Sequence, residues 1–206
     1  MGKKGLLVVM SGPSGAGKGT IVNRILALKK DIAVSVSCTT RAPRAGEVEG
    51  VSYFYLKGEK FQEKIDNGGL LEYAEFVGNK YGTPKDKVLE SLEDGTDIIL
   101  EIEVQGAEQI REKHDEAVLI FIVPPSLDEL KKRLVKRGTE TAEQAKNRLV
   151  KAEKELGLMQ SYNYVVINDD VDVAARKVID IINVEKLNVV RNKDLKERLI
   201  KGETIK

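Results

Sequence analysis

The sequence has only one cysteine and one histidine among its 206 residues. Because a lone cysteine cannot form an intrachain disulfide, the composition favours a protein of the reducing cytoplasm, in which Cys38 is a bystander. A lone histidine excludes a histidine-based metal cluster or catalytic triad within one chain. This residue, His114, lies in the charged stretch "REKHDE", so we expect it at the surface.

The chain also lacks long apolar runs and an excess of either charge. No segment approaches the roughly 20 apolar residues of a membrane span. The apolar run near the N-terminus is too short for a signal peptide, and Leu6 stands where a myristoylation signal needs Ser or Thr. Charged residues make up 33% of the chain, yet the net charge is only +1. This balance argues against a general binder of nucleic acid or of membrane surfaces.

Alternating strands and helices dominate the rest of the pattern. Hydrophobic residues make up 41% of the chain, enough for one packed domain or a core domain with a smaller inserted one. Apolar runs typical of buried strands occupy residues 5–11, 97–104, 117–124 and 164–169. Helical patterns cover residues 18–30, 84–93, 106–113, 126–160 and 171–187, and a polar helix with a frayed tail is expected after residue 191. This alternation predicts an α/β fold whose parallel sheet is wrapped on both faces by helices.

Residues 35–83 have a different character. They are rich in Thr, Ser, Tyr and Val and are interrupted by Gly and Pro, which predicts short, partly exposed strands in a small insertion. Aromatic side chains gather in this segment: Tyr53, Phe54, Tyr55, Phe61, Tyr73, Phe76 and Tyr81. Such a density fits a binding surface, and it also fits a small hydrophobic core.

A glycine loop, "GPSGAGKGT" at residues 12–20, joins the first apolar run to the first helical pattern. It fits the phosphate-binding pattern G-x-x-x-x-G-K-[ST] except at Gly19, because the hydroxyl comes one residue late, at Thr20. The flanking strand and helix disfavour the alternative of a tight glycine turn without a ligand. We expect ATP on the whole loop: Gly12, Pro13, Ser14, Gly15, Ala16, Gly17, Lys18, Gly19 and Thr20. The form "GKGT" is similar to the loop of nucleoside monophosphate kinases, where phosphates and water coordinate the metal.

Further motifs follow in order along the chain: "SVSCTTRAPRAGEVEG", "LLEYAEFVGNKYGTP", "LEIEVQGA", "VPPS", "LKKRLVKRGTET" and "VINDD". Over residues 5–190 the sequence resembles the guanylate kinase family. The resemblance implies a P-loop NTPase-type core at 1–34, 84–125 and 156–206. It also implies a mixed α+β GMP-binding insertion at 35–83 and a helical lid at 126–155. The implied reaction of purine nucleotide metabolism is phosphoryl transfer from ATP to GMP, with Mg²⁺ as Mg-ATP.

The resemblance also implies a role for individual residues. It assigns the GMP phosphate to Arg41, Arg44, Tyr53 and Tyr81, and guanine to Ser37, Glu72, Thr83 and Glu103. Lys18, Arg41 and three lid arginines, Arg133, Arg137 and Arg148, would carry catalysis, with Asn168 and Asp169 near the ATP base. Two guanidinium groups and two phenols suit a phosphate dianion. The family commonly has an Asp pair where this chain has Glu101 and Glu103, and Glu101 is a candidate to contact metal through water.

Two other classes of function share parts of this pattern. Guanylate-kinase-like domains of membrane-associated scaffold proteins bind peptides, but this chain keeps the full glycine loop and the lid arginines, and we expect no attached interaction domains. Kinases for adenylate or thymidylate share the loop but have no reason to carry Ser37, Glu72 and Thr83. We expect ATP and GMP as ligands, dGMP more weakly, and neither nucleic acid nor membrane. Monomer and homodimer both remain open.

Overall fold

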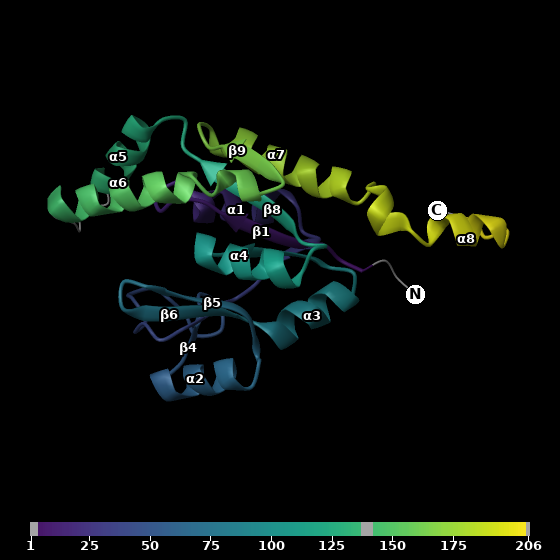
Figure 1. Cartoon of the computed structure of the whole chain (residues 1–206), viewed down its shortest axis with the longest axis horizontal. Helices are drawn as coiled ribbons and strands as arrows, with labels where there is room; N and C mark the ends of the chain where they lie inside the picture. The colour runs from purple at the N-terminus through teal and green to yellow at the C-terminus, as the bar shows by residue number, and fades with distance from the viewer. Residues whose placement is uncertain (1–3, 137–141, 205–206) are drawn as a thin grey trace.

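A five-stranded parallel sheet forms the centre of the protein, in a computed structural model that describes residues 4–136 and 142–204. Its strands lie in the order β2-β7-β1-β8-β9 (Figure 1). They are β1 (Leu7–Ser11), β2 (Ile32–Val34), β7 (Asp97–Glu101), β8 (Val118–Val123) and β9 (Tyr164–Ile167). The four apolar runs are therefore strands, as predicted, and only the short edge strand β2 was not predicted.

Helices cover both faces of this sheet. The helices α1 (Lys18–Leu28) and α7 (Val171–Glu185) lie on one face, and α3 (Lys85–Glu93) and α4 (Val104–Lys113) lie on the other. Successive side chains of a strand point to opposite faces. Val8 and Met10 accordingly belong to the core beneath α1 and α7, whereas Leu7 and Val9 belong to the core beneath α3 and α4. The predicted α/β fold is confirmed.

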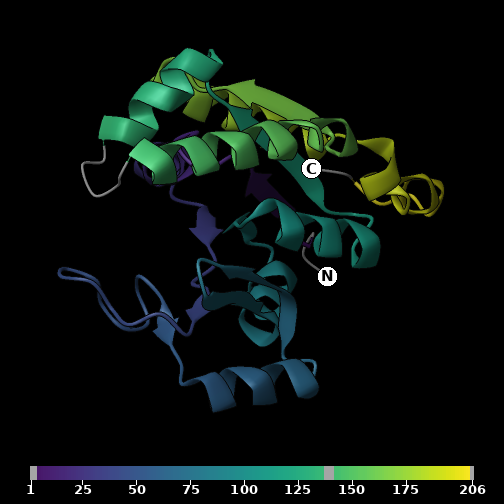
Figure 2. The same ribbon diagram turned by 60° about the vertical axis from the view of Figure 1, so that its left-hand side comes forward.

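A second, four-stranded mixed sheet is inserted between β2 and α3. Its strand order is β4-β3-β6-β5, and a helix, α2 (Gly58–Asp66), accompanies it. Its strands are β3 (Cys38–Thr39), β4 (Phe54–Tyr55), β5 (Leu70–Phe76) and β6 (Asn79–Pro84). In both views this sheet lies on the far side of α4 from α5 and α6 (Figures 1 and 2). Phe61 of α2 is completely buried, so part of the aromatic density builds a small core here.

The region predicted as helical over 126–160 contains two helices, α5 (Leu127–Lys136) and α6 (Ala142–Leu156), followed by the 3₁₀ turn η1 (Met159–Ser161). The end of α6 just before Gly157 agrees with the tendency of glycine to follow a helix. The two helices pack through Leu130, Leu134 and Ala152. The long charged stretch therefore forms a pair of helices with a small apolar core of its own.

The C-terminal part continues from α7 into the 3₁₀ turn η2 (Val189–Asn192) and the helix α8 (Leu195–Ile200), which extends away from the central sheet in Figure 1. His114, expected at the surface, has a side chain that is 22% exposed, and its Nδ1 lies 3.7 Å from Oε1 of Glu116. Cys38 is buried, and burial raises the pKa of its thiol to about 11, so it stays protonated. Within the described ranges, no helix has the length and apolar character needed to cross a membrane.

A buried carboxylate ties the amino ends of the central strands to the C-terminal segment. Asp97, at the start of β7, is 1% exposed. One of its oxygens accepts a hydrogen bond from the backbone N–H of Leu6 at 3.0 Å, and the other lies 2.6 Å from Nζ of Lys186, just after α7. The carboxylate thus joins two neighbouring strands to the end of a helix.

We expect Asp97→Ala to lower the free energy of unfolding by about 3 kcal/mol, because it removes the acceptor of the buried Leu6 N–H and the ion pair with Lys186. Asp97→Asn keeps an acceptor for Leu6 and should lose less. Urea denaturation of the three proteins measures both effects. A loss within about 0.5 kcal/mol for Asp97→Ala, as is usual for surface positions, would contradict this account.

Candidate active site

The glycine loop runs from the end of β1 to the start of α1. Gly12, Gly15 and Gly17 have φ angles of 140°, 91° and 88°, a region that glycine enters without steric cost. A Cβ atom on Gly12 would lie 2.2 Å from the carbonyl oxygen of Ile122, and one on Gly17 would lie 2.3 Å from Nδ2 of Asn168. These close approaches require glycine. The first N–H groups of α1 have no acceptor within the helix, so the loop presents donors to an anion.

Two side chains hold the loop in this shape. Nζ of Lys18 donates to the carbonyl oxygen of Gly12 at 2.6 Å, so the ammonium group lies across the loop where phosphates are expected. Nδ2 of Asn168 donates to the carbonyl oxygen of Ala16 at 2.7 Å and is buried. Asn168 was expected near the ATP base, and here its amide supports the loop backbone, while its neighbour Asp169 is exposed.

Glu101 lies beside the start of α1, where the usual hydroxyl is missing. A Cβ atom on Gly19 would lie 3.3 Å and 3.4 Å from the two carboxylate oxygens of Glu101. Glycine therefore leaves room for this carboxylate at the glycine loop. Burial raises the pKa of Tyr53 in the inserted segment, and the charge of Glu101 raises it further. Glu101 thus lies beside the glycine loop, and its charge acts on Tyr53 of the insertion.

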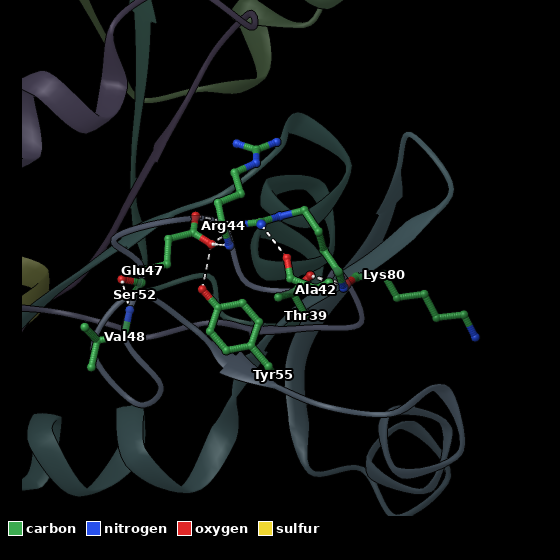
Figure 3. Close-up of polar contacts among 9 residues, drawn as sticks. Thr39, Ala42, Arg44, Glu47, Val48, Ser52, Tyr55 and Lys80 are labelled. Carbon is green, nitrogen blue, oxygen red and sulfur yellow. Dashed lines mark hydrogen bonds and ion pairs between the residues drawn. The ribbon is translucent and has the colours of Figure 1, made fainter.

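A network of polar contacts orders the first of the arginines expected to bind the acceptor phosphate (Figure 3). Nη2 of Arg41 contacts both carboxylate oxygens of Glu47, at 2.8 Å and 3.0 Å. Glu47 also accepts from the backbone N–H of Arg44 and from the hydroxyl of Tyr55, each at 2.8 Å. These donors, Arg41 first, lower the pKa of Glu47 to about 2, so it stays ionised at neutral pH. The Arg44 side chain itself is exposed.

The two tyrosines expected to bind the same phosphate lie beside Arg41. The guanidinium carbon of Arg41 lies 5.4 Å from the ring centroid of Tyr53, within range of a cation–π contact. The rings of Tyr53 and Tyr81 are 6.0 Å apart in an edge arrangement. The structure therefore brings Arg41, Tyr53 and Tyr81 together, with the exposed Arg44 at the edge of the group.

A buried carboxylate marks the expected guanine pocket. Glu72 on β5 is 3% exposed, and burial raises its pKa to about 7. Its Oε1 accepts a hydrogen bond of 2.6 Å from the hydroxyl of Thr83 on β6. A Cβ atom on Gly106 of α4 would lie 2.1 Å from Oε2 of Glu72, so glycine in this helix makes room for the carboxylate. Thr83 was expected to donate to guanine, whereas in this structure its proton is committed to Glu72.

Glu103 and Ser37 complete the expected set. Glu103 is the N-cap residue of α4, and its negative charge contributes to the raised pKa of Glu72. Its Oε2 is buried and has no hydrogen-bond partner among the described residues. Ser37 precedes β3 and is partly buried, and its carbonyl oxygen accepts from the N–H of Phe54 at 2.9 Å. Of these two carboxylates, Glu72 already accepts from Thr83, whereas Oε2 of Glu103 could accept from a ligand rich in N–H groups.

The lid arginines are partly described. Nε of Arg133 on α5 contacts Glu129 at 2.9 Å, and its Nη2 donates to the backbone carbonyl of Asn168 at 3.0 Å, so this arginine lies at the glycine loop. Arg148 lies on α6 and is partly buried. Arg137 falls outside the described residues. Sequence reasoning missed Glu47, although an acidic residue six positions after Arg41 was a usable signal.

The comparisons with known proteins agree on one family. The sequence profile of the guanylate kinase family matches residues 4–185. The chain is 52% identical to the guanylate kinase of Caldanaerobacter subterraneus subsp. tengcongensis and 51% identical to that of Clostridioides difficile, covering 94% of both chains in each case. A crystal structure of guanylate kinase from Anaplasma phagocytophilum matches with a TM-score of 0.79 and 32% identity, covering 97% of both chains. The chain belongs to the guanylate kinase family.

Proposed function

We propose that the protein transfers a phosphoryl group from ATP to GMP, giving ADP and GDP. The observation that carries this proposal is the presence of two anion-binding groups. One is the glycine loop with Lys18, beside which Glu101 lies, and the other is the cluster of Arg41, Tyr53 and Tyr81. A donor triphosphate would bind the first group and an acceptor monophosphate would bind the second.

The geometry of β6 links the acceptor phosphate to its base. Tyr81 and Thr83 are two residues apart on this strand, so their side chains share one face. Guanine presents N1–H and N2–H₂ side by side, and the Glu72 carboxylate offers two acceptors that can take both. Adenine has a bare nitrogen at that edge and would leave the carboxylate unpaired. The pocket therefore supports GMP over AMP, and over a thymidylate that lacks the purine edge.

The protein contributes positioning and charge stabilisation to the transfer. The acceptor oxygen already carries negative charge, so no strong general base is needed. Lys18 and the N–H groups of the glycine loop hold the donor phosphates, while Arg41 holds the acceptor in line with them. Arg133 and Arg148 come from the α5–α6 pair to neutralise charge on the transferring group. Arg137 is proposed for the same role from the sequence alone.

Mg²⁺ is proposed to bind together with ATP, where it would offset the negative charge of the phosphates. Its protein contacts would be few, because Mg²⁺ keeps several waters. The carboxylate of Glu101 at Gly19 provides oxygen ligands of the kind that Mg²⁺ prefers, and it fits contact through water. Across the described ranges no group of three or more His, Cys, Asp or Glu residues is placed so that it could hold a metal ion.

A substrate panel tests the proposed reaction against its rivals. ADP formation is measured in a coupled assay with GMP, dGMP, AMP and dTMP in turn. We expect GMP to be used, dGMP more weakly, and AMP scarcely at all, since a site built for a missing hydrogen-bonding group rejects the analogue by about ten-thousandfold. Turnover of AMP or dTMP in preference to GMP would indicate another monophosphate kinase. Turnover of none of them would favour a peptide-binding module.

We expect Lys18→Ala to reduce phosphoryl transfer by about a hundredfold or more, because the ammonium group would stabilise charge that develops on the phosphates. Lys18 is only partly buried, so its loss opens no core cavity and the melting temperature should stay close to that of the parent. Single-turnover rates with Mg-ATP and GMP measure the effect. A rate within about threefold of the parent would remove Lys18 from the mechanism.

Glu72→Gln replaces one acceptor with a donor that faces the guanine N–H groups. We expect kcat/KM for GMP to fall at least tenfold, or about 1.4 kcal/mol, with the affinity for ATP nearly unchanged. The exposed Glu75 on the same strand provides the control, Glu75→Gln, which should behave like the parent. If Glu72→Gln handles GMP as the parent does, the base is read elsewhere.

The same variant should change how stability depends on pH. The pKa of Glu72 in the folded protein, about 7, lies above its ordinary value, so the folded state binds the proton more tightly. The free energy of unfolding of the parent should therefore decrease as pH rises from about 4.5 to 7. The free energy of unfolding of Glu72→Gln relative to that of the parent should be about 2 kcal/mol higher at pH 8 than at pH 5. Urea denaturation without nucleotide measures both values. If the two proteins differ in free energy of unfolding by the same amount at both pH values, ionisation of the Glu72 carboxylate does not destabilise the folded protein.

A further inference from the structure

Lys151 on α6 contacts three groups that belong to different parts of the protein. Its Nζ lies 4.2 Å from the ring centroid of Phe76, at the end of β5 in the inserted sheet. It lies 3.4 Å from Oε1 of Glu155, one turn further along α6, and 4.0 Å from Oε2 of Glu103 at the start of α4. This side chain therefore joins the α5–α6 pair to the half of the site proposed to hold guanine.

Two carboxylates lie around this ammonium group with unused hydrogen-bonding capacity. Glu155 is 8% exposed, and its Oε2 is buried without a hydrogen-bond partner among the described residues. Oε2 of Glu103 is likewise buried without a hydrogen-bond partner among the described residues, and it lies too far from Nζ of Lys151 for a hydrogen bond. Leaving a buried acceptor of this kind without a hydrogen bond costs free energy. A small approach of α6 toward α4 would turn the ion pair into a hydrogen bond.

The spacing along α6 connects this contact to the proposed chemistry. Arg148, Lys151 and Glu155 are separated by three and four residues, so they lie on one face of the helix. Arg148 is proposed to stabilise the transferring phosphoryl group, and Glu103 is proposed to read guanine. A displacement of Lys151 toward Glu103 therefore moves Arg148 with it, because both side chains belong to the same rigid helix.

We propose that Lys151 is a positioning residue that couples guanine recognition to the placement of Arg148, and this inference rests on the proposed function. Guanine N–H groups occupy one oxygen of Glu103, and Lys151 donates to the other as α6 approaches. The stacked ring of Phe76 keeps the ammonium group in position for this step. Binding of GMP and binding of the donor nucleotide then strengthen each other by the same factor, as linkage requires.

The test compares Lys151→Met with Lys154→Met. Methionine keeps much of the length of Lys151 but removes its charge. Lys154 is exposed on the same helix and forms no ion pair within the described part of the chain. Isothermal titration calorimetry gives the affinity for GMP, for a non-hydrolysable ATP analogue, and for each ligand in the presence of the other. The coupling factor is the dissociation constant of one ligand measured alone divided by its dissociation constant measured in the presence of the other ligand.

We expect Lys151→Met to lower the coupling factor by at least about fivefold, the low end of typical couplings, with the analogue alone bound as in the parent. KM for GMP should rise and kcat should fall in the same variant, and Lys151→Arg should restore most of the coupling because it keeps the cation. Lys154→Met should match the parent. A coupling factor for Lys151→Met within about twofold of the parent overturns the proposal.

A second variant decides the question if Lys151→Met does not fold. Glu103→Gln leaves Lys151 and its ion pair with Glu155 in place but removes the charge of Glu103, so it should lose the coupling in addition to affinity for GMP. Retained coupling in Glu103→Gln also overturns the proposal. Failure of the proposed function is distinguishable, because in that case the parent itself would not turn over GMP. A parent that turns over GMP, together with fully coupled variants, would reject only the role of Lys151.

Discussion

Backbone atoms of the glycine loop pass so close to β8 and to the end of β9 that two positions leave no room for a side chain. At Gly12 the space belongs to the carbonyl of Ile122, and at Gly17 it belongs to the amide of Asn168. Because β1, β8 and β9 run parallel, their carboxyl ends meet at one edge of the sheet, and the loop rests on that edge. The donors of the loop are therefore fixed by the sheet before any phosphate arrives, which is the condition for electrostatic preorganisation.

The two proposed parts of the GMP site carry opposite charges: arginine lies at the phosphate position, and carboxylates lie at the base position. Around the proposed phosphate position, Glu47 neutralises Arg41 and holds it in a fixed orientation, so the cation is already in place. In the proposed base pocket, Glu72 and Glu103 are acceptors that the described residues satisfy only in part. Burial is the main cause of the raised pKa of Glu72, and the charge of Glu103 adds to it. In the proposed function, this cost in stability would provide selectivity for a ligand that brings N–H donors, the usual trade between stability and function.

The sequence predicted the parts of the fold that local patterns determine. Continuous apolar runs and helical periods gave the strands β1, β7, β8 and β9, the flanking helices and the glycine loop, and the resemblance supplied Glu72 and Thr83, which meet at 2.6 Å. It did not predict β2 or α2, whose patterns are short and half-exposed. Nor could it show that Thr83 donates to Glu72 or that Lys151 lies over Phe76, because these contacts depend on how distant elements pack.

The missing hydroxyl at residue 19 and the longer acid at residue 101 are two sides of one arrangement. A Cβ atom at position 19 would lie 3.3 Å from the Glu101 carboxylate, a tight contact, so glycine there leaves room for the longer acid beside the loop. A serine in the usual pattern offers one neutral oxygen, whereas Glu101 offers a charged pair. That charge also contributes to the raised pKa of Tyr53 in the inserted segment. A cation arriving with the donor phosphates would meet this counter-charge, held at the end of β7 beside Gly19, in place of a loop hydroxyl.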